Sequence, residues 1–222
     1  KYGVDLIFIE TMSDSYETKA ALLAAKENSS LPVFVSNAYG ADGKLMTGAT
    51  PAAMVAMLEG MGADAIGVNC SQGPRQLREI VRRMLRVASV PVIFKPNAGL
   101  PILRGGVTEY DITPEEFAAE VAAAVDEGVR IVGGCCGTTP AHIRALCAAI
   151  EGKKPLPISK KEITCVSSYT HTVEFGRAPV LVGERINPTG KPKLKEALRA
   201  GNMNYLLDEA VRQAERGAAV LD

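Results

Sequence analysis

Short apolar runs that alternate with helical patterns constrain the fold of this chain more than any other feature of its sequence. Within each run the apolar residues are consecutive, which is typical of strands covered on both faces, as in the parallel sheets of α/β proteins. The expected strands are residues 4–9, 33–36, 65–68, 92–94 and 129–132. The sequence therefore predicts five βα units in a parallel sheet.

Residues that favour helix starts lie between these runs. Thr50, Thr113 and Thr139 each precede a proline, and Asp14 has a glutamate three residues after it. Both patterns are common at helix N-termini. Parallel strands joined by right-handed helical crossovers occur in (β/α)₈ barrels and in doubly wound sheets, so the pattern admits both folds.

The ends of the expected strands favour the barrel. In a barrel the carboxyl ends of all strands meet on one face, where functional side chains gather. Polar or sulfur-containing residues at or just after these ends are Glu10, Ser36, Asn69, Cys70, Asn97, Cys135 and Cys136. We therefore predict that residues 1–152 form five βα units of a (β/α)₈ TIM barrel.

A second region begins after an irregular stretch. Residues 153–178 contain two prolines near their start and no helical period, so we predict a linker there. Strands are then expected at 180–182 and 218–221, with helices at 194–200 and 205–217. Residues 179–222 are therefore predicted to begin a second α/β domain, and the chain is interpreted as a fragment of a larger protein.

Charge and composition narrow the choice of partners. Twenty-five basic residues balance twenty-five acidic ones, so no bulk charge favours nucleic acid or an anionic membrane. The apolar runs are far shorter than the ~20 residues that span a bilayer. The first ten residues lack the pattern of a secretory signal, and an odd number of cysteines disfavours a secreted disulfide framework. We expect a cytoplasmic protein with a small-molecule partner.

Three of the five cysteines follow expected strands. Cys70 comes after one strand, and the pair Cys135 and Cys136 comes after another. Three thiolates select zinc among the common metals, and three protein ligands leave one position open for a substrate. A strained disulfide between the adjacent cysteines, or simple burial of each cysteine, would also fit this spacing. The spacing alone leaves these alternatives open.

Four other candidate ligands are not expected to bind metal. Cys147 occupies a helical position beside Leu146 and is expected to pack, and Cys165 lies in the predicted linker. His142 and His171 fall on a helix and in the linker, away from the strand ends.

Two sequence motifs carry a resemblance to known enzymes. The run Gly-Val-Asn-Cys-Ser at 67–71 and the run Gly-Gly-Cys-Cys-Gly-Thr-Thr-Pro at 133–140 together resemble the zinc signature of homocysteine methyltransferases. The run Gly-Glu-Arg-Ile-Asn-Pro-Thr-Gly at 183–190 resembles the start of the pterin-binding domain of cobalamin-dependent methionine synthases. The resemblance implies that residues 1–152 are the C-terminal five βα units of a homocysteine-binding barrel, followed by the beginning of a second, pterin-binding TIM barrel for methyltetrahydrofolate.

The same resemblance implies an activity and its cofactors. Zinc held by Cys70, Cys135 and Cys136 would take the sulfur of homocysteine as a ligand, and a zinc-bound thiol is deprotonated. The thiolate would attack a methyl group carried by cobalamin from 5-methyltetrahydrofolate, forming methionine. No Asp-x-His-x-x-Gly run is present, so cobalamin is expected on a separate cobalamin-binding module of the same enzyme.

Further site residues follow by position. In the family pattern Glu10 holds the ammonium group of homocysteine, and Asn97 lies near the zinc, where it could fill the open position. Glu10 could instead be a helix N-terminal carboxylate, and Asn97 could shape a turn. Ser36 and Asn69 are interpreted as residues that hydrogen-bond the substrate or the cysteine loops.

In the second region Glu184 and Asn187 are predicted to bind the pterin, with turn formation before Pro188 as the alternative.

Two rival functions remain at this stage. A homocysteine methyltransferase that uses betaine or a sulfonium donor would share the zinc signature, although the 183–190 motif argues against it. A non-catalytic zinc or redox-sensing module would use the same cysteines without an open ligand position.

Overall fold

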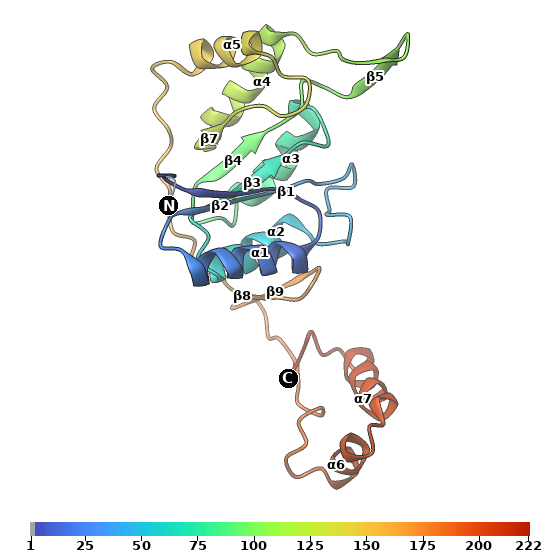
Figure 1. The fold of residues 1–222 in the computed structure, drawn as a ribbon. Helices are drawn as coiled ribbons and strands as arrows, with labels where there is room; N and C mark the ends of the chain where they lie inside the picture. The colour runs from blue at the N-terminus through green and yellow to red at the C-terminus, as the bar shows by residue number, and fades with distance from the viewer. Residues whose placement is uncertain (1–2) are drawn as a thin grey trace. The chain divides into compact units, whose positions relative to one another are not determined.

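A parallel five-stranded sheet forms the centre of the first part of the molecule, in a computed structural model that describes residues 3–222 (Figure 1). The strands are adjacent in the order of the chain, β1-β2-β3-β4-β7. Their bounds are β1 Ile7–Met12, β2 Val33–Asn37, β3 Ala65–Asn69, β4 Val92–Lys95 and β7 Ile131–Val132. The predicted parallel sheet and its five strands are confirmed.

The first strand lies later in the sequence than predicted. Ile7 pairs with Val33, where β2 begins, so the preceding residues have no strand beside them, and Val4 is 61% exposed. At its other end β1 continues to Met12 through an irregularity in its register with β2. Glu10 and Thr11 consequently lie inside β1 and not after it.

Five helices follow the strands of this sheet, and three of the predicted start signals, Asp14, Thr50 and Thr113, cap three of them. Asp14 accepts a hydrogen bond from the Glu17 N–H at 2.8 Å, and Thr50 accepts one from the Ala53 N–H at 3.2 Å. The helices are α1 Ser15–Asn28, α2 Pro51–Gly60, α3 Pro74–Leu85, α4 Pro114–Asp126 and α5 Pro140–Ile150. No helix of the described chain is long and apolar enough to cross a bilayer.

The core lies between the sheet and these helices. Val33 and Val35 of β2 join a single apolar cluster with Val68 of β3 and Phe94 of β4, to which all five helices contribute. Because side chains alternate along a strand, the residues between these point to the opposite face of the sheet. Each helix also contacts the next one along the chain. The helices therefore form one layer on one face of the sheet.

A hairpin that the sequence analysis did not predict separates β4 from α4. It consists of β5 Pro101–Arg104 and β6 Val107–Tyr110, which pair antiparallel. Gly105 and Gly106 form its two-residue turn with φ of 56° and 83°. Two residues with positive φ favour glycine and match the twist of a tight hairpin.

The predicted linker contains a second hairpin. Its strands are β8 Thr164–Ser167 and β9 Thr172–Phe175. The segment 167–172 belongs to the same compact unit as residues 3–162, which we call the first unit. In the first unit the Ser15 hydroxyl donates a hydrogen bond to the Tyr169 carbonyl at 2.9 Å. The ring centres of Tyr169 and Tyr16 are 4.4 Å apart.

Residues 163–166 and 173–222 form the second unit. It contains a parallel pair, β10 Val182–Gly183 and β11 Val220–Leu221, and two helices, α6 Pro192–Arg199 and α7 Met203–Glu215. These elements agree with the predicted order of strand, two helices and strand. The described residues of this unit form the β10-β11 pair and most of the β8-β9 hairpin, and no second barrel.

Candidate metal centre

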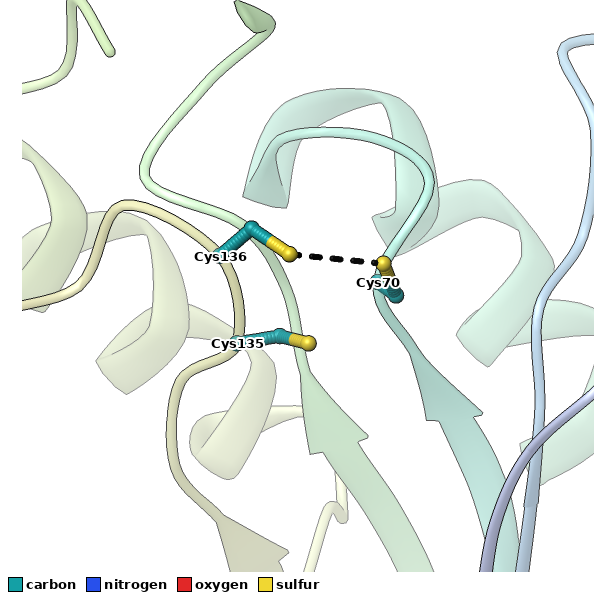
Figure 2. Close-up of side chains that lie close together, drawn as sticks. All are labelled: Cys70, Cys135 and Cys136. Carbon is teal, nitrogen blue, oxygen red and sulfur yellow. Dashed lines mark hydrogen bonds between the residues drawn. The ribbon is translucent and has the colours of Figure 1, made fainter. Parts of the chain in front are cut away.

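The three predicted metal ligands meet at the carboxyl ends of β3 and β7. Cys70 follows β3 directly, whereas Cys135 and Cys136 lie in the loop after β7. Figure 2 shows the side chains of Cys70 and Cys136 pointing toward each other, with the Cys135 sulfur directed into the same space. The Cys70 and Cys136 sulfurs are 3.7 Å apart, and all three sulfurs lie within 4.8 Å of one another. All three are free thiols, so the vicinal disulfide is not formed.

This spacing fits a tetrahedral metal ion. Zinc–sulfur bonds of about 2.3 Å at tetrahedral angles place two sulfurs roughly 3.8 Å apart. The Cys70–Cys136 separation matches that value, whereas a disulfide would bring two sulfurs to about 2 Å. Among the described residues no fourth cysteine, histidine or acidic residue joins the group. The three thiols could therefore hold a thiophilic ion and leave one position open.

Backbone strain is concentrated at this centre. Thr11, Cys70 and Ser71 have φ of 63°, 60° and 59°, and they are the non-glycine residues with positive φ in the described chain. Such conformations cost about 1 kcal/mol or more and persist where the surroundings impose them. Here the Cys70 N–H donates to the Lys95 carbonyl at 3.1 Å, and the Ser71 hydroxyl donates to the Tyr39 carbonyl at 2.7 Å.

Asn69 connects the strand ends to the cysteines. Its side-chain oxygen accepts from the Ser36 hydroxyl at 2.7 Å and from the Thr11 N–H at 3.0 Å. Its side-chain nitrogen donates to the Thr11 hydroxyl at 2.6 Å and lies 3.8 Å from the Cys135 sulfur. Asn69 and Ser36 are fully buried. The structure thus places Asn69 beside Cys135, and Ser36 contacts the Asn69 side chain.

Asn97 links the two loops that carry the cysteines. Its side-chain oxygen accepts from the Cys136 N–H at 3.0 Å, and its own N–H donates to the Gln72 carbonyl at 3.0 Å. The residue is 4% exposed. In this arrangement the Asn97 oxygen holds the backbone of a ligand residue.

Close packing explains the glycines around the cysteine pair. A Cβ on Gly134 would lie 2.4 Å from a Thr138 methyl carbon, and a Cβ on Gly137 would lie 2.2 Å from the Tyr110 ring. Gly137 also has φ of 77°, which disfavours any side chain. The Thr138 hydroxyl in turn donates to the Cys135 carbonyl at 2.7 Å.

Tyr110 is a residue of this centre that the sequence analysis missed. The β5–β6 hairpin places its ring against Gly137, the residue after Cys136. Desolvation first, and then the charge and hydrogen bond of Cys136, raise the pKa of Tyr110. The Gly105-Gly106 pair was the signal that could have revealed the hairpin.

Glu10 forms an ion pair with Lys95, a second residue that was not predicted. The Lys95 amine contacts the Glu10 carboxylate and lies 4.8 Å from the centre of the Phe8 ring. Glu10 is on β1 and Lys95 is on β4, with two strands between them. In a flat sheet those strands would be about 14 Å apart, so the contact indicates that the sheet curls toward this face.

The residues that were set aside lie elsewhere. His142 is 7% exposed, accepts from the Thr139 N–H at 3.2 Å and contacts the Ile112 carbonyl at 3.0 Å, so it has a packing role. His171 is exposed. Cys147 is exposed on α5, so the expectation that it packs in the core was wrong, because it lies on the outer side of the helix.

The two predicted pterin residues lie in the loop after β10 of the second unit. The Lys191 amine donates to the Glu184 carboxylate at 2.7 Å and to the Asn187 carbonyl at 2.9 Å. Lys191 lowers the pKa of Glu184 through this hydrogen bond and through its charge. The Asn187 side chain accepts from the Thr189 N–H at 2.9 Å, a local turn contact.

Comparisons with known proteins identify relatives that align with nearly all of this chain. The methionine synthases of Mycobacterium tuberculosis (strain ATCC 25618 / H37Rv) and Mycobacterium leprae (strain TN) are 38% and 36% identical over 228 and 233 residues. Both alignments cover 99% of this chain but 19% of the relative, so the chain spans about a fifth of their length.

Solved structures of the homocysteine methyltransferase MmuM from Escherichia coli are similar to about two thirds of this chain. The apo form has 26% identity and a TM-score of 0.52, and it covers 66% of this chain and 50% of its own. The metallated form has 25% identity and a TM-score of 0.54, with 66% and 45% covered. The family model described as homocysteine S-methyltransferase matches residues 1–150. With more than half of its residues matched by that model, this chain belongs to the homocysteine S-methyltransferase family.

Proposed function

We propose that this chain forms the homocysteine-activating part of a methionine synthase, with zinc held by Cys70, Cys135 and Cys136. The observation that carries this proposal is the meeting of three thiols at two strand ends, with the Cys70 and Cys136 sulfurs 3.7 Å apart. A metallated form of the related MmuM is known, which supports a bound metal in this chain as well. Thiolate ligands favour zinc among the common metals.

The surrounding residues hold this ligand set in place. Asn69 contacts the Cys135 sulfur and Asn97 holds the Cys136 backbone, so both fix the direction of the thiols. Residues that orient metal ligands in this way commonly change metal affinity 10- to 100-fold when they are lost. When bound, zinc lowers the pKa of a substrate thiol, so that thiolate is available at neutral pH.

Glu10 supplies the contact to the amino group of homocysteine in this proposal. Glu10 is next to Thr11, whose N–H donates a hydrogen bond to the Asn69 side chain. The Asn69 side chain in turn contacts the Cys135 sulfur. A carboxylate there makes a charge-assisted hydrogen bond with an ammonium group. In the reaction the thiol loses its proton, a carbon–sulfur bond forms, and the bond between the methyl group and its donor breaks.

The extent of the similarity favours a methionine synthase over a betaine- or sulfonium-dependent enzyme. The mycobacterial alignments continue through residues 151–222, whereas MmuM covers 66% of the chain. We therefore assign the second unit to the methyltetrahydrofolate side, with Glu184 and Asn187 toward the pterin. The methyl carrier is then cobalamin, held by another module of the same enzyme.

The arrangement of the first unit supports closure of its sheet into a (β/α)₈ barrel. The strands of the first unit are adjacent in the order of the chain and its helices cover one face of the sheet, as in a (β/α)₈ barrel. In a doubly wound sheet the strand order reverses and helices cover both faces. The division proposed is residues 1–152 for the later part of this barrel, 153–178 for the linker, and 179–222 for the start of a second barrel.

The zinc ligand shell of the full-length protein tests the proposal. X-ray absorption should show three sulfur ligands without substrate and four after homocysteine is added, because one position is open. Methionine, which lacks a thiol, serves as the control and should leave three. A shell that homocysteine does not change would instead support a storage or redox-sensing role.

A further inference from the structure

The ion pair between Glu10 and Lys95 brings two opposite charges to the edge of the proposed substrate site. Lys95 is the last residue of β4, and its carbonyl accepts from the Cys70 N–H at 3.1 Å. The side chains of Lys95 and Glu10 are 22% and 38% exposed. The pair is therefore partly shielded from water and adjoins the strand end that carries a metal ligand.

The position of the Lys95 side chain is defined from several sides. Its amine lies over the Phe8 ring, and its aliphatic stem passes the site of Gly133, where an added Cβ would be 3.4 Å from it. Phe8 and Glu10 are two residues apart on β1 and therefore point to the same face. Contacts with Phe8 and Gly133 thus hold the Lys95 side chain in the conformation that reaches Glu10, unlike that of a freely moving surface lysine.

A primary ammonium at Glu10 is the group that this carboxylate is expected to bind in the substrate. If the substrate ammonium takes that place, Lys95 loses its partner while it stays largely out of water. An unpaired, partly buried charge is costly, so a new anion must reach Lys95. An α-amino acid carries that anion on the same carbon as its ammonium group.

We propose that Lys95 binds the carboxylate of the thiol amino acid while Glu10 binds its ammonium group. The internal ion pair is then exchanged for two pairs with the zwitterion, and net charge is conserved. Lys95 becomes a specificity residue that selects α-amino acids among small thiols. This inference rests on the proposed function, because it concerns the same substrate at the same site.

Calorimetric binding to the zinc-loaded, full-length protein tests this role with two thiols, homocysteine and its decarboxylated analogue. The wild-type protein should bind homocysteine about 10- to 100-fold more tightly than the decarboxylated analogue, because one hydrogen bond between charged groups contributes about that much affinity. Lys95→Met should remove that preference by weakening homocysteine alone, and Lys95→Arg should retain most of it. Zinc content should be equal in all variants.

A matched control is Lys153→Met, because Lys153 also pairs with a carboxylate, that of Asp126 at 2.7 Å. It should leave both affinities unchanged. Tighter homocysteine binding by Lys95→Met would mean that Lys95 only competes with the substrate for Glu10. An equal loss of affinity for both thiols would mean that Lys95 has a structural role. Either result overturns the inference. If wild-type protein binds neither thiol, the proposed function fails instead.

Discussion

Polar residues lie at the carboxyl ends of parallel strands in both units, at the ends of β3 and β4 in the first and after β10 in the second, yet they are organised differently. In the first unit Asn69 is fully buried and Asn97 is 4% exposed, and their bonds join segments far apart in the sequence. In the second unit the Glu184 side chain is 61% exposed, and its partner Lys191 is seven residues away.

This difference shows what neighbouring strands add to a site. Hydrogen bonds shielded from water are strong and mutually supporting, whereas exposed ion pairs contribute about 0–1 kcal/mol. Five strand ends around Asn69 provide that shielding, and the two short strands beside Glu184 do not. We therefore expect the first site to be preorganised and the second to depend on its ligand for order.

Loss of a metal ligand is the strongest test of the preorganised site. Cys136→Ala in the full-length protein should reduce zinc from about one ion per chain toward none, because three ligands become two. Metal analysis after dialysis measures this. Cys147→Ala, at an exposed cysteine on α5, is the control and should keep its zinc. Full zinc in Cys136→Ala would remove this cysteine from the centre.

Loss of a residue behind the ligands should have a smaller effect. Asn69→Ala removes the bonds to Ser36, Thr11 and Cys135, and zinc affinity should fall about 10- to 100-fold. Competition with a chelator measures the affinity. Asn28→Ala, at an exposed asparagine that ends α1, should leave the affinity unchanged. If both variants behave alike, the buried network does not orient the thiols.

The second unit can be tested through the two half-reactions. Asn187→Ala should slow methyl transfer from methyltetrahydrofolate to cobalamin about 5- to 10-fold, as one lost hydrogen bond predicts, without slowing methylation of homocysteine. Asn187→Asp keeps the acceptor for the Thr189 N–H and removes the amide donor. An active Asn187→Asp variant would show that Asn187 acts only through its turn.

The smallest effect is expected outside both sites. The hydrogen bonds of Arg82, followed by those of Arg78, hold the pKa of Glu127 at about 2, below the ordinary 4.5. A lowered acid pKa stabilises the fold above pH 4.5, and this contribution is lost as the pH falls toward 2. Because the Glu127 side chain is 25% exposed and water screens its ion pairs in part, Glu127→Gln should cost only about 1 kcal/mol at pH 7.

Amide hydrogen exchange in α3 and α4 measures this local stability. Protection should fall about fivefold at pH 7 in Glu127→Gln, and the difference from wild type should shrink as the pH approaches 2. Glu151→Gln, at an exposed residue after α5, is the control. A difference that persists at low pH would contradict the ion-pair explanation.

Local patterns in the sequence were sufficient to predict the sheet and its helices. The consecutive apolar residues of β2, β3 and β4 are covered on both faces, and this burial makes such runs visible. The start of β1 was misplaced because Val4 is apolar yet has no partner strand. The sequence of one segment does not show which of its residues will pair with a neighbouring strand. The β5–β6 hairpin was missed because four-residue strands give little periodic signal.

The candidate site was predictable where spacing alone places a residue. Cys70, Cys135 and Cys136 follow strands that are neighbours of β4, so their meeting follows from strand order. Lys95 and Tyr110 were not predictable in this way. The first reaches Glu10 only because the sheet curls, and the second reaches Cys136 only through the hairpin.

Thr11, Cys70 and Ser71 have left-handed backbone conformations, which lower the stability of the fold. Selection for stability would therefore remove these conformations, whereas selection for function would keep them. At Thr11 and Ser71 glycine would relieve the strain and should stabilise the fold, but it would delete hydroxyls that bond Asn69 and the Tyr39 carbonyl. Programmes that seek thermostable variants by consensus or by strain relief would be drawn to these positions. They are the positions such programmes should leave unchanged.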